Sequence, residues 1–221
     1  MNEAKTIRIV KPKEKVEISN VVVSNSDGID IDSASIVIIN GLQLSNARAG
    51  LSVDGAKVYM KNVILDTIQY CFRLNSCGVS IFFTEDFVIE STSVKSADYG
   101  FQIYKSKGVI INSNAINNKR ASGTFNQNGG GIRVIEGTVK MINVDLINNS
   151  VGQSGGGFHC EKSTLDVYGG KIQLNRALSG GAGQCDSECK FFAVGVDIKE
   201  NSEREPSKCN GISNVLKKLK K

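Results

Sequence analysis

The chain has 221 residues, of which 40% are hydrophobic and 6% aromatic, and it contains no tryptophan. Its formal net charge of +5 is concentrated near the two ends, so the body is almost neutral and a nucleic-acid-binding function has little support. No run of residues approaches the ~18 apolar residues that a membrane-spanning helix needs, so we expect no transmembrane segment.

A short apolar strand that leads to an Asn-rich or Gly-rich corner recurs eight times along the chain. In seven of these units an element of the form small, apolar, any, apolar returns, and successive elements are 22, 21, 29, 31, 26 and 25 residues apart. Such a period is typical of a solenoid, in which each repeat packs on its neighbours. The units begin near Val16, Val37, Tyr59, Phe82, Val109, Lys140, Val167 and Ala193, and the returning elements at Gly28, Gly50, Cys71, Gly100, Gly131, Gly157 and Ala182.

Polarity alternates within the repeats in the manner of β-strands, as where Ile132 and Val134 flank Arg133. No segment carries a sustained helical stripe, and the units are too short for propeller blades of roughly 40 residues. We therefore predict an all-β fold, a right-handed parallel β-helix of about eight coils. The predicted segments are an N-terminal cap or lead-in strand (1–15), the β-helix (16–212) and a basic C-terminal tail (213–221).

Asparagine is frequent where the second strand of a unit ends. Asn side chains stacked at one corner can hydrogen-bond along the rod axis and tolerate a left-handed backbone, so we assign them a structural role rather than a binding role. The corner positions expected to align are Asn46, Thr67, Ser91, Asn118, Asn149, Asn175 and Asn201.

The chain has six cysteines, an even number. Cys160 and Cys185 fall in the same inward column of adjacent coils, so we expect them to stack as buried apolar residues, with a disulfide as the alternative. The spacing of Cys185, Cys189 and Cys209 is a poor match to tetrahedral zinc modules. We expect no metal and no cofactor.

A polysaccharide lyase or hydrolase needs an acid, a base and a charge-stabilising group on neighbouring coils. The outward column between the returning apolar residues has no carboxylate pair, and the nearest acids, Asp54, Glu136 and Glu161, each stand alone on a coil. Arg133 and His159 would lie one coil apart on this face and could bind an anionic or hydroxyl-rich ligand. We predict no catalytic residues, and a candidate ligand-binding column made of Arg73, Gln102, Arg133, His159 and Gln184.

Residues 128–201 resemble the repeats of polymorphic outer membrane protein adhesins. These repeats pair a Gly-Gly-small-Ile motif with an aromatic-x-x-Asn motif inside a pectin-lyase-like β-helix; here Leu146 and Ile172 stand near where the family has phenylalanine. Similar repeats occur in large cysteine-containing surface proteins of protists. The resemblance implies surface attachment or a structural rod without enzymatic activity. It rests on segments 129–132, 155–158 and 180–183 for the first motif, and on Asn149 and Asn175 for the second.

The leading hypothesis is a non-catalytic structural or adhesive module of a surface or extracellular protein, which contacts a protein or glycan partner through long corner loops at 119–128 and 202–208. The alternatives are a carbohydrate-active or carbohydrate-binding protein that uses the outward column, and an intracellular scaffold. The first residues lack the apolar segment of a secretory signal. We therefore expect either a cytoplasmic protein or a piece of a longer surface chain, with end-to-end self-association possible through exposed strand edges.

Overall fold

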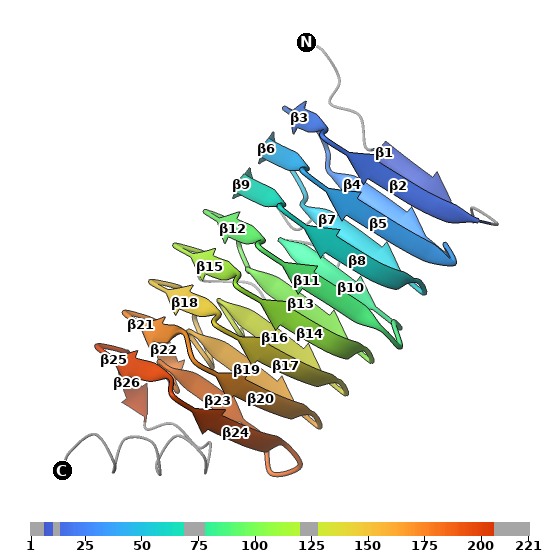
Figure 1. Cartoon of the computed structure of the whole chain (residues 1–221). Helices are drawn as coiled ribbons and strands as arrows, with labels where there is room; N and C mark the ends of the chain where they lie inside the picture. The colour runs from blue at the N-terminus through green and yellow to red at the C-terminus, as the bar shows by residue number, and fades with distance from the viewer. Residues whose placement is uncertain (1–6, 11–13, 69–77, 120–127, 206–221) are drawn as a thin grey trace.

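The computed structural model describes residues 7–10, 14–68, 78–119 and 128–205. The chain winds through three parallel sheets in turn, so that each coil contributes one strand to each sheet and eight coils stack into a rod (Figure 1). This confirms the predicted β-helix and its number of coils. β1 lies inside the segment expected to be a cap or lead-in strand, and the predicted basic tail, 213–221, lies outside the described residues.

The three sheets have eight strands each, and a fourth has two. Sheet A contains β1 (Ile7–Val10), β4 (Ile29–Asp32), β7 (Leu51–Asp54), β10 (Val79–Phe82), β13 (Phe101–Tyr104), β16 (Ile132–Ile135), β19 (Phe158–Glu161) and β23 (Gly183–Cys185). Sheet B contains β2 (Lys15–Ser19), β5 (Ile36–Asn40), β8 (Lys57–Lys61), β11 (Phe87–Glu90), β14 (Lys107–Ile111), β17 (Thr138–Ile142), β20 (Thr164–Tyr168) and β24 (Lys190–Val194). Sheet C contains β3 (Val22–Ser24), β6 (Gln43–Ala47), β9 (Ile64–Ile68), β12 (Ser93–Lys95), β15 (Asn114–Ile116), β18 (Asp145–Ile147), β21 (Lys171–Gln173) and β25 (Asp197–Lys199), and β22 (Arg176–Ser179) pairs with β26 (Ser202–Glu205).

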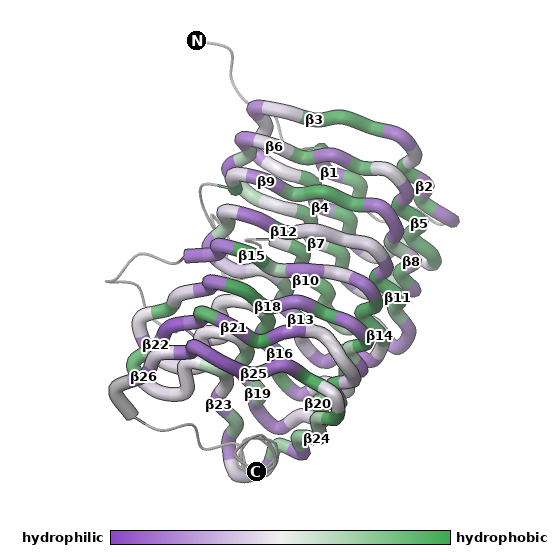
Figure 2. The backbone as a smooth tube through the Cα atoms, turned by 60° about the vertical axis from the view of Figure 1, so that its left-hand side comes forward, coloured by the Kyte–Doolittle hydropathy of each residue, from purple (hydrophilic) through white to green (hydrophobic). Residues whose placement is uncertain are grey.

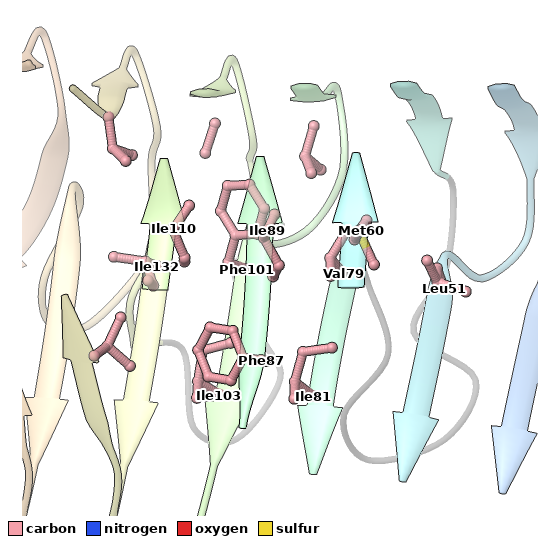
Figure 3. Close-up of a cluster of buried hydrophobic side chains, with 14 of the residues drawn as sticks. Leu51, Met60, Val79, Ile81, Phe87, Ile89, Phe101, Ile103, Ile110 and Ile132 are labelled. Carbon is pink, nitrogen blue, oxygen red and sulfur yellow. The ribbon is translucent and has the colours of Figure 1, made fainter. Parts of the chain in front are cut away.

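The core is one continuous column of apolar side chains that runs along the rod. Alternate residues of every strand point inward, so that Ile81, Ile103 and Val134 are register partners in successive coils and all are buried. Figure 3 shows part of this stack, with Phe87 and Phe101 filling the centre. Hydrophilic and hydrophobic stretches alternate along each coil (Figure 2), because each strand has a polar outer face. Within the described residues there is no helix long and apolar enough to cross a membrane.

The fourth coil differs from the sequence prediction. The returning element was expected at 71–74, but the sheet A strand of this coil is β10, and residues 71–74 lie outside the described part. Gly78 precedes β10 and lies directly between Gly50 and Gly100, where a Cβ atom on any of the three glycines would come within 2.3 Å of a carbonyl oxygen of the next coil. The small residue of the motif is therefore required by coil-to-coil contact.

A buried ladder of asparagines joins the last four coils at the corner that follows sheet C. Asn118 donates through Nδ2 to Oδ1 of Asn149, Asn149 donates to Asn175 and Asn175 donates to Asn201, over distances of 2.9, 3.0 and 3.0 Å. The Oδ1 atoms of the last three also accept the backbone N–H of the preceding ladder residue, that of Asn118 accepts the N–H of Ala97, and each Nδ2 reaches a carbonyl of sheet C. The amide groups thus satisfy buried polar atoms that would otherwise be unpaired.

The structural role predicted for these four asparagines agrees with the ladder, but the predicted column was wrong in its other members. The ladder residues do not have the left-handed backbone; the residue before each of them does, as Asn117 and Asn148 show. Asn46 and Thr67 belong to that left-handed column, and Ser91 belongs to the corner between sheets B and C. Two adjacent columns were merged because both are rich in asparagine.

We expect Asn149→Ala to lower the free energy of unfolding by about 3 kcal/mol, because it leaves the backbone N–H and one of the two Nδ2 hydrogens of Asn118 buried without an acceptor. Urea denaturation of the full chain measures this. Asn40→Ala is the control, since Asn40 accepts a ladder bond of the same type from Asn62 at the surface. An equal loss in both variants would contradict a special role for the buried ladder.

Candidate functional site

The predicted outward column exists on sheet A. Gln102, Arg133, His159 and Gln184 are register partners on four successive strands. Arg73, by contrast, lies outside the described residues, and the column position of its coil is occupied by Ser80, which pairs with Gln102. The displacement of β10, the fourth strand of sheet A, is the reason for this correction.

The column is covered rather than open to solvent. Gln102 and His159 are only 4% and 8% exposed, and Arg133 and Gln184 are half-buried. The glycine-rich segments that enter each strand fold back over the column. Gly155 is an example, since a Cβ atom placed on it would lie 3.1 Å from the Cβ of His159. His159 is therefore not the solvated side chain expected from its outward register, and the ligand-binding role of the column stays a prediction.

Burial, together with the positive charge of Arg133, lowers the pKa of His159 to about 4. The imidazole is therefore neutral at physiological pH, and its Nε2, 4.0 Å from Glu161, forms no ion pair there. Its Nδ1 is buried and has no hydrogen-bond partner within the described residues. A neutral, shielded imidazole cannot supply positive charge to an anionic ligand.

One pair of carboxylates was missed in the sequence. Asp54 was expected to stand alone, yet it is the register partner of Asp32. The two residues are the last of β7 and β4, which are neighbouring strands of sheet A. Burial and the charges of Asp32 and Asp30 raise the pKa of Asp54. The pairing was missed because Asp32 was not placed in register with its neighbour in the next coil.

Three cysteines meet where sheet A turns into sheet B in the last coil. The sulfur atoms of Cys160, Cys185 and Cys189 all lie within 4.8 Å of one another, and within the described residues this is the one group of potential ligands with the spacing of a metal site. Cys160 and Cys185 are register partners, as expected, but Cys160 forms a disulfide with Cys189, and Cys185 is disulfide-bonded too. Cys160 and Cys185 are stacked and buried, as expected, but the alternative of a disulfide between them was wrong, because the corner after Cys185 brings Cys189 back to Cys160 in the neighbouring coil.

A hollow of about 570 Å³ lies on the corner between sheets A and B, across the last five coils. We call it the saddle. It arises from corner length, since four residues lie between Phe82 and Phe87, but three lie between their register partners Tyr104 and Gly108. The saddle is lined by corner segments 84–85, 105–107, 136–138 and 162–164 and by residues 188 and 190.

The far side of the saddle is raised in the same way. Four residues lie between Cys185 and Lys190 in the last coil, whereas three lie between their register partners Cys160 and Thr164. Three short corners are thus enclosed by two longer ones. Ser106 and Ser163 lie buried beneath, where each hydroxyl accepts a backbone N–H from the preceding coil and so holds the short corners in line.

The saddle is rich in charged and hydroxyl groups. Lys105 pairs with Glu136 at 3.5 Å, and a hydrogen bond with Tyr104, together with the charge of Glu136, raises the pKa of Lys105. Within the described part of the chain, the other three lysines of the saddle form no ion pair. These are Lys107, Lys162 and Lys190. Sequence reasoning missed this site because its signal, a one-residue difference in corner length, is visible only when the register of every coil is known.

Comparison with known protein families identifies one to which this fold corresponds. The family described as a right-handed β-helix region matches residues 7–172. The chain belongs to this right-handed β-helix family. The match confirms the predicted handedness and the solenoid repeat. No curated protein and no solved structure matched the chain in the same comparisons.

We expect loss of the disulfide between Cys160 and Cys189 to lower the free energy of unfolding of the β-helix by about 3–4 kcal/mol, because it closes a loop of 29 residues between two coils. Urea denaturation of Cys189→Ser measures this, with Ser187→Ala in the same corner as the control. Peptide mapping without reduction should recover a linked pair of peptides that contain Cys160 and Cys189. Alkylation of Cys160 in the unreduced protein would contradict the linkage.

The β-helix should lose stability in acid through His159. The folded-state pKa of about 4 lies below the unfolded value of 6.5, so the contribution is present above pH 6.5 and is lost as the pH falls toward 4. The loss is about 3 kcal/mol over that window. In His159→Gln this part of the decline should be absent when the free energy of unfolding is measured against pH, whereas a parallel decline in both proteins would show that His159 is not buried and neutral.

Proposed function

We propose that the chain is a non-catalytic β-helical module of a cell-surface or extracellular protein, and that it contacts a protein or glycan partner through the saddle. The observation that carries the proposal is the composition of the saddle: a hollow of about 570 Å³ on a rigid stack of coils, with three lysines that form no ion pair within the described residues. Ligand sites of this volume on rigid scaffolds are common in proteins.

Two further observations support the proposal. The disulfide between Cys160 and Cys189 is of a kind that persists in oxidising compartments, which favours an extracellular location. The resemblance of residues 128–201 to adhesin repeats and protist surface proteins favours an adhesive role. The corner loops first expected to make contacts, 119–128 and 202–208, lie partly outside the described residues, so the proposal rests on the saddle.

End-to-end association remains a second mode of contact to propose. β2 and β24 are the outer strands of sheet B, and the outer strand of a sheet offers an edge to which another strand can add. A filament of β-helical modules would be the result.

The carbohydrate-active alternative is favoured by one observation, the carboxylate pair of Asp32 and Asp54. A carboxyl group with a raised pKa beside a second carboxylate is the arrangement that glycoside hydrolysis requires of an acid and its partner. The pair lies in the two coils that precede the saddle, so the two functions are separable by substitution.

Filling the saddle should abolish partner binding without unfolding the chain. Thr138→Tyr together with Thr164→Tyr places two large side chains at outward strand positions that favour aromatic residues. Ligands that the full chain selects from a glycan array and a displayed peptide library should bind this variant at least about tenfold more weakly. Lys57→Tyr is the control, because Lys57 begins the strand of sheet B that precedes the saddle.

Two results would contradict the proposal. One is a set of ligands that the filled variant binds as well as the unmodified chain does. The other is release of sugar products from polysaccharides at a rate that Asp54→Asn abolishes, which would establish the carbohydrate-active alternative.

A further inference from the structure

One column of the saddle floor has a defined order of chemical groups. Lys107, Thr138, Thr164 and Lys190 are register partners on four successive strands of sheet B. All four begin their strands and point outward. Because neighbouring strands are about 4.8 Å apart, the two lysines stand about 14 Å apart with two hydroxyl groups between them.

One acidic side chain accompanies each of the two lysines. Glu85 belongs to the longer corner one coil before Lys107, and Glu188 belongs to the longer corner that leads into Lys190. Glu136 already pairs with Lys105. Along the rod axis the saddle therefore reads negative, positive, hydroxyl, hydroxyl, positive, with the second acidic residue, Glu188, in the same coil as the second lysine.

This order disfavours a uniform polyanion, whose outer charges would meet Glu85 and Glu188. A polypeptide can carry both signs in the required order. An extended chain advances about 3.4 Å per residue, so side chains four residues apart are separated by about 14 Å and point to the same side. Two carboxylates at that spacing match Lys107 and Lys190, and the hydroxyls of Thr138 and Thr164 can bond the peptide between them.

We propose that the saddle binds an extended peptide segment of a partner protein in which two acidic residues, four positions apart, are flanked by basic residues. This inference rests on the proposed contact function and names the class of its partner. Lys107 and Lys190 hold the two carboxylates. The basic flanks point to the other side of the extended segment, and Glu85 and Glu188 attract them without direct contact. Lys162, on the corner above Thr164, adds positive charge over the centre of the segment.

The test is a titration of the full chain with the peptide KDTVTDK, in which binding is measured by calorimetry or fluorescence anisotropy. Its control peptide, DKTVTKD, has the same composition with the two charged pairs inverted. We expect KDTVTDK to bind and the inverted peptide to bind at least about tenfold more weakly. Lys107→Glu and Lys190→Glu should each weaken binding of KDTVTDK about tenfold, and Lys57→Glu, at the start of an earlier strand of sheet B, should leave it unchanged.

A compensating pair sharpens the test. The peptide KKTVTDK should bind Lys107→Glu better than it binds the unmodified chain, because the exchanged charges again attract each other. Equal binding of KDTVTDK and DKTVTKD, or insensitivity to Lys107→Glu, would overturn the inference. If KDTVTDK fails to bind in the millimolar range while array ligands still depend on Thr138 and Thr164, the inference fails and the proposed contact function stands. If no ligand depends on the saddle, both fail.

Discussion

The structure depends on one constraint, the in-register stacking of every coil on the next. Each strand of sheets A, B and C pairs in parallel with the corresponding strand of the neighbouring coil, so one residue position recurs along the rod at the inter-strand spacing. An inward position then becomes a column of the core, and an outward position becomes a row of surface groups. A chain of this kind cannot bury a single coil alone, and stability comes from the stack.

The same constraint explains the polar interior and the glycine-rich motifs. The asparagines from Asn118 to Asn201 can bond one another because stacking places them directly in line, and each amide then satisfies backbone groups that turn away from the sheets. The glycines before sheet A serve the opposite need, since a side chain at Gly131 would strike the carbonyl of Gly157 in the next coil. Motifs that suggest ligand binding in a sequence are here the contacts between coils.

The sequence was sufficient to predict the features that recur in every coil. It was insufficient where one coil differs from its neighbours. The number of coils and the pairing of Arg133 with His159 follow from periodicity, because adjacent repeats share one register. The sheet A strand of the fourth coil was misplaced because 71–74 and 78–81 fit the same loose motif, and only contact with Gly50 and Gly100 distinguishes them. The burial of His159, the disulfide of Cys160 and the saddle all depend on where a loop or corner folds in space, which periodicity does not encode.

We propose that function lies at the corners, because the side chains inside the stack are occupied by contacts between coils. The outer column of sheet A is largely covered, whereas the saddle combines lysines and hydroxyls on a rigid floor. Amide chemical-shift mapping of the isotope-labelled chain, titrated with KDTVTDK, separates these two surfaces most directly. The account predicts shift changes confined to residues 84–85, 105–107, 136–138, 162–164, 188 and 190. Changes centred on Gln102, Arg133, His159 and Gln184, with the saddle unaffected, would contradict it.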